Sequence, residues 1–143
     1  MKNQTNNIIE KMSLLPAELQ DIIREYLPKY VLAFTNKQNY ILYHSFIHKT
    51  IPRYDNYVRN TIRNDHIFVF EFIVKENYKK WLNQINYNYQ NIIFNTYLSF
   101  IIHYCIENNS NKCKNFLYDY IKNHGLCKNQ HKKNIINHIR WKN

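Results

Sequence analysis

A single glycine, Gly125, occurs among the 143 residues of the chain. Glycine adopts the positive φ angles of tight turns most readily, so a fold built from many hairpins is disfavoured. The phosphate-binding loops of dinucleotide-binding and P-loop proteins need at least two glycines and are excluded. Hydrophobic residues still make up 45% of the chain, enough to bury a core. The sequence therefore predicts an all-α fold of a single domain, or a domain with a small appended module.

Apolar residues recur at intervals of three and four along most of the chain, which is the period of a helix. The pattern predicts an irregular bundle of about seven helices without a fixed repeat. Two of these helices precede Pro52, and a short segment connects them. The others are expected over residues 53–64, 66–82, 90–107, 111–123 and 130–141, with a polar turn over residues 83–89.

Nothing in the sequence predicts an enzyme or a membrane protein. The carboxylates are few and most lie beside Lys or Arg, and His103 and Cys105 are two residues apart on one helix, so their side chains face different ways. The apolar runs 67–74 and 97–106 are too short to span a bilayer. Three cysteines without a secretory signal indicate reduced thiols in an intracellular protein. We expect no catalytic residues and no cofactor.

Four residues near the only glycine are the weak candidates for a metal site. Thiolate and imidazole groups at short spacing across a turn are the ligands of structural zinc. Their order does not match a standard zinc finger, and a cysteine buried in the core together with histidines clustered by chance is the favoured explanation, so we predict no metal. The four residues are Cys113, His124, Cys127 and His131.

The net charge of +10 is distributed unevenly. Residues 1–71 carry nine Lys and Arg against seven Asp and Glu, whereas residues 72–143 carry eleven against three. A basic helix rich in amides can lie along a phosphate backbone, so sequence-independent binding of nucleic acid by the C-terminal half is an alternative function. A solvated face enriched in lysine by an AT-rich genome is the other explanation. The basic residues concerned are Lys128, Lys132, Lys133, Arg140 and Lys142.

Residues 15–40 resemble an F-box. The segment opens with the Leu15-Pro16 pair, has an acidic residue before Leu19, and continues with an isoleucine pair and a Tyr-Leu pair. The run Thr35-Asn36-Lys37 matches the end of the family pattern. The stretch between Leu27 and Thr35 is a few residues shorter than in the family, so the second of its three helices is expected to be short.

The F-box resemblance implies a three-helix unit that docks on a Skp-type adaptor of a cullin ubiquitin ligase. An apolar ridge that begins at a proline can lie in the groove of a partner. By this resemblance residues 13–50 form an F-box-like unit packed on helical hairpins. The polar residues 1–12 are expected to form a frayed tail, and the charge distribution makes residues 51–143 a basic helical body. The residues that would face the adaptor are Leu15, Pro16, Leu19, Ile22 and Leu27.

The whole chain also resembles a type of uncharacterised protein encoded by giant nucleocytoplasmic large DNA viruses. The segments that carry this resemblance are 35–40, 54–59 and 126–133. About one residue in six is asparagine, which agrees with an AT-rich genome. The resemblance implies a viral protein in the cytoplasm or nucleus of a host cell and implies no particular activity.

The sequence as a whole predicts a non-enzymatic interaction protein. Its F-box-like unit would recruit an adaptor, and its helical body would bind a second partner. Thirteen tyrosines agree with this, because tyrosine suits surfaces that are half apolar and half polar. A structural component of a virion is a third possibility, and the oligomeric state is left open.

Overall fold

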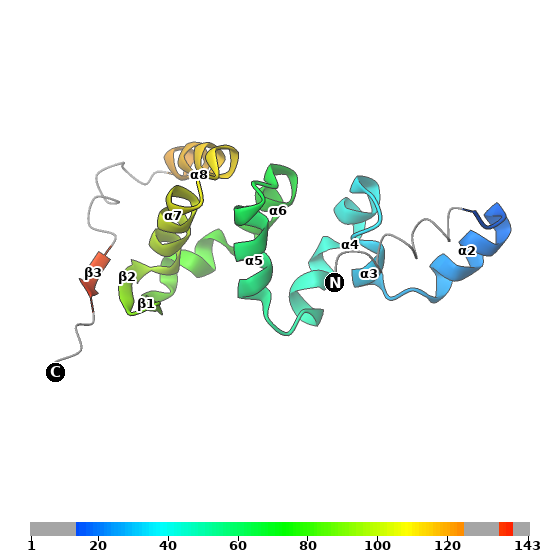
Figure 1. The fold of residues 1–143 in the computed structure, drawn as a ribbon, viewed down its shortest axis with the longest axis horizontal. Coiled ribbons are helices and arrows are strands. Elements are labelled where there is room, and N and C mark those ends of the chain that lie inside the picture. Colours follow the sequence, from blue (N-terminus) through cyan, green and yellow to red (C-terminus); the bar gives the residue numbers. More distant parts are fainter. Residues whose placement is uncertain (1–13, 125–134, 139–143) are drawn as a thin grey trace. The chain divides into compact units, whose positions relative to one another are not determined.

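The computed structural model describes residues 14–124 and 135–138, and it divides the chain into two compact units (Figure 1). Unit 1 spans residues 1–52 and unit 2 spans residues 53–143. The helices are α2 (Ala17–Tyr26), α3 (Lys29–Leu32), α4 (Lys37–Thr50), α5 (Tyr54–Arg63), α6 (Ile67–Asn83), α7 (Tyr97–Glu107) and α8 (Asn111–Asn123), and the strands are β1 (Ile85–Tyr89), β2 (Ile92–Thr96) and β3 (Ile135–His138). The structure is mostly helical, which confirms the coarse prediction. The expectation of an all-α fold is wrong, because a small antiparallel sheet lies in unit 2.

Two prolines set the boundaries of the first helices. Pro16 precedes α2 and Pro28 precedes α3, both with extended backbone. Because proline disfavours the helical conformation in the residue before it, α2 ends at Tyr26 and a separate helix begins at Lys29. With four residues, α3 is short, as the spacing between Leu27 and Thr35 predicted.

Helix α4 begins at a side-chain cap and buries one side. The side chain of Asn36 accepts a hydrogen bond of 2.8 Å from the backbone N–H of Asn39 and so caps the helix. Tyr40 and Ile47, seven residues apart, are buried on the same side of the helix. Ile41, next to Tyr40, is exposed.

Unit 2 contains two helix pairs, α5–α6 and α7–α8, and each pair is joined in the same way. Asp65 lies two positions after the end of α5 and has a φ of 48°, and Asn109 lies two positions after the end of α7 and has a φ of 54°. Around it the backbone forms the paired hydrogen bonds of a Schellman motif, from Asp65 to Ile62 and from His66 to Thr61 in the first pair. In the second pair the equivalent hydrogen bonds run from the N–H of Asn109 to the carbonyl of Ile106, at 3.1 Å, and from the N–H of Ser110 to the carbonyl of Cys105, at 2.9 Å.

The two connections also contact each other. The carboxylate of Asp65 accepts hydrogen bonds from the backbone N–H groups of Cys113, at 2.9 Å, and Lys112, at 3.1 Å. These groups belong to the first turn of α8, where backbone N–H groups have no partner within the helix. The buried hydroxyl of Ser110 donates to the backbone carbonyl of Ile62 at 2.5 Å. Asp65 and Ser110 thus hold the second helix pair against the first.

A β-hairpin connects the two helix pairs. Strands β1 and β2 pair in antiparallel register, with Tyr87 opposite Phe94 and Tyr89 opposite Ile92. The turn consists of Gln90 and Asn91, whose φ angles of 49° and 64° are those of a type I′ turn. Strand β3 pairs with the other side of β2.

The core of unit 2 is centred on α7. Eight of the eleven side chains of α7 are buried, and this helix contacts α5, α6, α8 and both hairpin strands. A helix that is apolar on all sides is typical of one enclosed by other elements. Thr96 caps its start by accepting the backbone N–H of Ser99 at 3.1 Å.

Three of the expected elements differ in the structure. Residues 83–89 contain β1 rather than a polar turn, and the helix expected from residue 90 begins at Tyr97, after β2. Residues 135–138, expected inside a last helix, form β3. The helices expected over 53–64, 66–82 and 111–123 are confirmed to within two residues as α5, α6 and α8. The rest of the expected last helix lies outside the described residues.

We predict that Asp65→Gly lowers the free energy of unfolding by about 1–2 kcal/mol. Glycine suits the positive φ at this position, so the loss isolates the missing carboxylate. Asn109→Gly is the matched control at the equivalent position of the second helix pair, and it should leave stability unchanged or raise it slightly. Urea unfolding followed by circular dichroism measures both variants, and equal effects would contradict the assigned role of Asp65.

The same contact should make unit 2 sensitive to acid. Desolvation raises the pKa of Asp65, but the backbone hydrogen bonds from Cys113 and Lys112 outweigh it, and the pKa is lowered. A carboxylate whose pKa is lowered in the folded state contributes its full stabilisation when the pH is above the pKa of the unfolded chain, about 4. This contribution to the free energy of unfolding is lost as the pH falls through the folded-state pKa. The stability difference between wild type and Asp65→Gly should therefore narrow in acid.

The hairpin turn offers a stabilising substitution. Asn-Gly is the preferred sequence of a two-residue type I′ turn, because both residues need positive φ. Changing Gln90 to Asn and Asn91 to Gly together should raise the free energy of unfolding by about 0.5–1 kcal/mol, because the left-handed conformation costs about 1–2 kcal/mol in a residue such as glutamine and less in asparagine and glycine. A lower melting temperature in this double variant would show that the turn side chains have another role.

Candidate partner-binding surface

The residues that match the F-box pattern lie on and around α2. Leu15 and Pro16 directly precede this helix, and the carbonyl of Pro16 accepts the backbone N–H groups of Leu19 and Gln20 at 3.0 and 3.1 Å. Leu27 follows the helix, and its N–H donates to the carbonyl of Arg24. The structure thus places the predicted residues along one continuous segment of unit 1.

No side chain of α2 is buried. Leu19 is 46% exposed, Ile22 is 50% exposed and Tyr26 is 84% exposed. At 3.6 residues per turn these three side chains lie on one side of the helix. We call Leu19, Ile22 and Tyr26 the α2 ridge.

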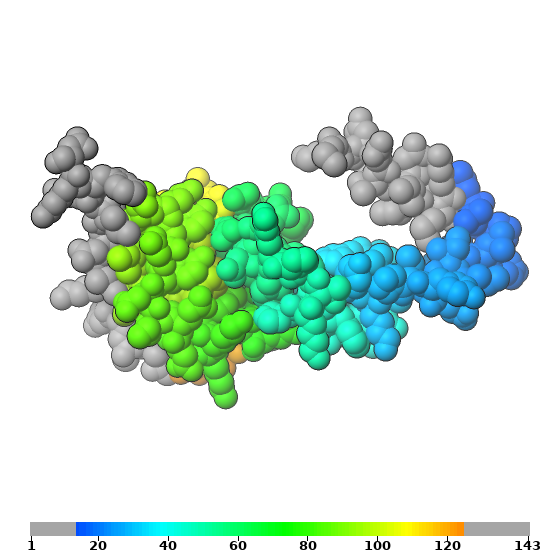
Figure 2. Space-filling model, turned by 90° about the horizontal axis from the view of Figure 1, so that it is seen from below, coloured from blue at the N-terminus to red at the C-terminus, as the bar shows by residue number. Residues whose placement is uncertain are grey.

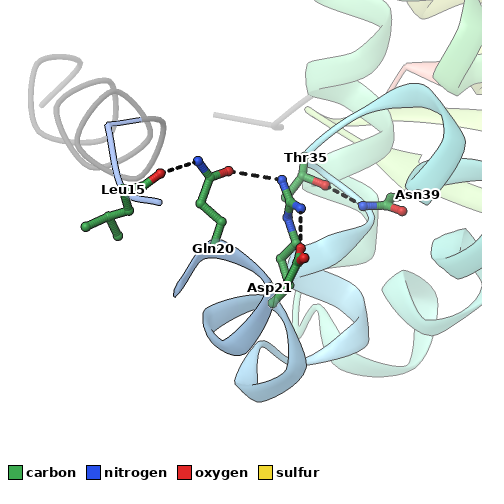
Figure 3. Close-up of polar contacts among 6 residues, drawn as sticks. Leu15, Gln20, Asp21, Thr35 and Asn39 are labelled. Atoms are coloured by element: carbon green, nitrogen blue, oxygen red, sulfur yellow. Dashed lines mark hydrogen bonds and ion pairs between the residues drawn. The ribbon is translucent and has the colours of Figure 1, made fainter. Parts of the chain in front are cut away.

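Polar side chains occupy the other side of α2. Gln20 donates to the carbonyl of Leu15 at 2.8 Å, and Arg24 forms an ion pair of 2.8 Å with Asp21 (Figure 3). Arg24 also donates to Gln20 at 3.4 Å. These polar contacts lie on the side of α2 away from the α2 ridge.

The structure distinguishes among the five residues predicted to face an adaptor. Leu19, Ile22 and Pro16 are exposed, whereas Leu15 and Leu27 are half-buried. Tyr26, with a larger exposed fraction than any of the five, was not among them, although its spacing from Leu19 and Ile22 places it on the same side. Further exposed apolar residues of unit 1 lie near α3 and on α4: Phe34, Ile41, Leu42 and Phe46.

The weak metal candidates do not come together within the described residues. Cys113 is buried near the start of α8, and His124 directly follows the end of that helix, stacked on Tyr120 at 4.1 Å between ring centres. Ten residues of helix lie between the two, which places them about 16 Å apart along its axis, too far to share one ion. No group of three metal-ligating side chains occurs in the part of the chain that the structure describes, and Cys127 and His131 lie outside it.

Cys105 and Cys113, the two thiols among the described residues, are poor nucleophiles. Burial raises the pKa of Cys105 to about 12, and burial together with the hydrogen bond to Asp65 raises the pKa of Cys113. The neighbouring His103 pairs with Glu107 at 3.1 Å rather than with Cys105. The two cysteines therefore belong to the core, and His103 does not act as a base for Cys105.

The basic residues of the alternative function, Lys128, Lys132, Lys133, Arg140 and Lys142, lie outside the described residues. Residues 53–124 of unit 2 carry nine basic and six acidic side chains, so the described body is only mildly basic. Among the described residues, no helix is both long enough and apolar enough to cross a membrane.

No protein-family model matches the chain, and neither a curated protein nor a solved structure matches it.

We predict that Leu19→Asp leaves the free energy of unfolding within about 0.5 kcal/mol of wild type, because an exposed side chain contributes little to the core. Ile47→Asp, which buries a charge at a position that is 1% exposed, should unfold unit 1. Circular dichroism during heating measures both. A large loss of helix in Leu19→Asp would mean that the α2 ridge is part of the core.

Proposed function

We propose that the protein is a non-enzymatic interaction protein. In this proposal the α2 ridge of unit 1 binds a Skp-type adaptor of a cullin ubiquitin ligase, and unit 2 binds a second protein. The setting would be the cytoplasm or nucleus of a host cell, in agreement with the resemblance to giant-virus proteins.

The exposure of the α2 ridge is the observation that supports adaptor binding most directly. No side chain of α2 is fully buried, and Leu19, Ile22 and Tyr26, which repeat on one side of the helix, leave about half or more of their surface exposed. Covering such residues by a partner is favourable by about 25 cal/mol per Å² of apolar surface. The same residues match the F-box pattern at Leu19 and Ile22, so two independent lines agree on this surface.

The test is capture of a purified Skp-type adaptor by the full-length chain. Wild type should retain the adaptor, and Ile22→Asp should lose it, because a charge in the middle of an apolar contact costs several kcal/mol. Ile106→Asp is the matched control, since Ile106 is 51% exposed, nearly the same as Ile22, but lies in unit 2. This control should bind like wild type.

Two outcomes would contradict the proposal. One is the absence of adaptor binding by the folded wild-type chain. The other is equal weakening by Ile22→Asp and Ile106→Asp, which would show that an added negative charge, rather than the α2 ridge, controls binding.

A further inference from the structure

Helix α5 carries two arginines whose side chains are fixed against tyrosine rings. The guanidinium of Arg59 lies 5.3 Å from the ring centre of Tyr89, and it also contacts the side chain of Asn56. Nε of Arg63 donates to the hydroxyl of Tyr104 at 2.6 Å. Arg63 is exposed and Arg59 is half-buried, so both are accessible from one side of α5.

The tyrosines themselves are anchored in the core of unit 2. The rings of Tyr89 and Tyr104 both pack on Phe100, which is fully buried, with centres 4.7 and 5.4 Å apart. The two rings also meet edge to face at 5.9 Å. An arginine held on a rigid surface loses less conformational entropy when it binds a ligand, so this arrangement favours recognition.

The first turn of α5 carries the opposite charge. The carboxylate of Asp55 accepts a hydrogen bond of 3.1 Å from the hydroxyl of Tyr97. Burial, with Asp55 as the next largest cause, raises the pKa of Tyr97, so the hydroxyl keeps its proton and remains a donor. Asp55, Arg59 and Arg63 are spaced four residues apart and therefore form one stripe with one negative and two positive groups.

The spacing of the arginines fits an extended peptide. Side chains one helical turn apart have Cβ atoms about 5–6 Å apart, and alternate residues of a strand are separated by about 6.6 Å. Each guanidinium can bind a carboxylate through two parallel hydrogen bonds. The exposed amides of Asn60 and Asn64 also lie one turn apart beside the arginines. The NH2 group of Asn64 donates to the backbone and side-chain oxygens of Asn60, at 2.8 and 3.2 Å, so the NH2 group of Asn60 and the side-chain oxygen of Asn64 are the groups that would contact a peptide backbone.

We propose that the face of α5 bearing Arg59 and Arg63 binds an extended acidic segment of a protein partner, with carboxylates at alternate positions. This inference rests on the proposed function, in which unit 2 binds a second protein, and it specifies that this second protein carries an extended acidic segment. A nucleic acid fits less well, because the stripe has two cations beside an anion, whereas binding to nucleic acid relies on many phosphate contacts. The face of unit 2 seen in Figure 2 is mostly green, so residues of the first helix pair and the hairpin form it together.

The test uses the full chain and a fluorescein-labelled peptide of alternating glutamate and serine. A peptide of about eight residues is long enough, because an extended chain rises about 3.3 Å per residue and a helix only about 1.5 Å, so the peptide exceeds α5 in length. Fluorescence anisotropy should detect binding of this peptide and none of the glutamine–serine analogue. Arg59→Gln with Arg63→Gln should weaken binding about tenfold or more. Lys79→Gln with Lys80→Gln removes the same charge from exposed positions of α6 and should change the affinity less than about twofold.

Arg59→Lys with Arg63→Lys separates fixed geometry from charge. Lysine keeps the charge but lacks the planar fork, so binding should again weaken. Unchanged melting temperatures would show that the variants remain folded. The proposal is wrong if wild type fails to bind the peptide, or if Arg59→Gln with Arg63→Gln weakens binding no more than Lys79→Gln with Lys80→Gln does. It is also wrong if the arginines are needed for binding of single-stranded DNA, tested in parallel, but not for binding of the peptide.

The two proposals fail in different ways. Arg59→Gln with Arg63→Gln should leave capture of the adaptor unchanged, and Ile22→Asp should leave peptide binding unchanged. A chain that binds the peptide but no adaptor would retain this inference on unit 2 and remove the proposed role of unit 1.

Discussion

Two backbone N–H groups at the start of α8 donate to the carboxylate of Asp65, which lies just beyond the end of α5. This contact connects the end of α5 in the first helix pair with the beginning of α8 in the second pair. Ser110 adds a hydrogen bond to Ile62 in the same region. With the two pairs held in this way, α7 is enclosed between α5, α6 and α8, and the hairpin covers part of it. The tyrosines that position Arg59 and Arg63 depend on that core.

The scarcity of glycine misled the prediction of fold class for a definite reason. The structure places Asp65, Asn86, Gln90, Asn91 and Asn109 at positive φ, where glycine is usual. Asparagine and aspartate tolerate this region better than other residues, because their short polar side chains interact with the nearby backbone. An abundance of asparagine therefore replaces glycine in the turns of this chain. The alternation of apolar and polar residues in Ile85–Tyr89 was the sequence signal of a strand.

The long helices were predictable because their apolar spacing extends over several turns, as in α6 and α8. The candidate site was predictable in part. The Leu15-Pro16 pair and an Ile/Leu pattern located the α2 ridge, but whether Leu19 and Ile22 were exposed depended on the packing of the rest of unit 1. The contacts of Arg59 and Arg63 with Tyr89 and Tyr104 join residues far apart in the sequence, and no local pattern indicates them.

The proposed function assigns a different binding surface to each unit: an exposed apolar ridge in unit 1, and charges fixed on a rigid aromatic base in unit 2. Its central claim is that the α2 ridge is the adaptor-binding surface. Hydrogen–deuterium exchange of the full chain, with and without a purified Skp-type adaptor, tests this claim most directly. We expect slower exchange across residues 17–27 and little change in α5–α8. Unchanged exchange of α2 at a saturating adaptor concentration would contradict the account.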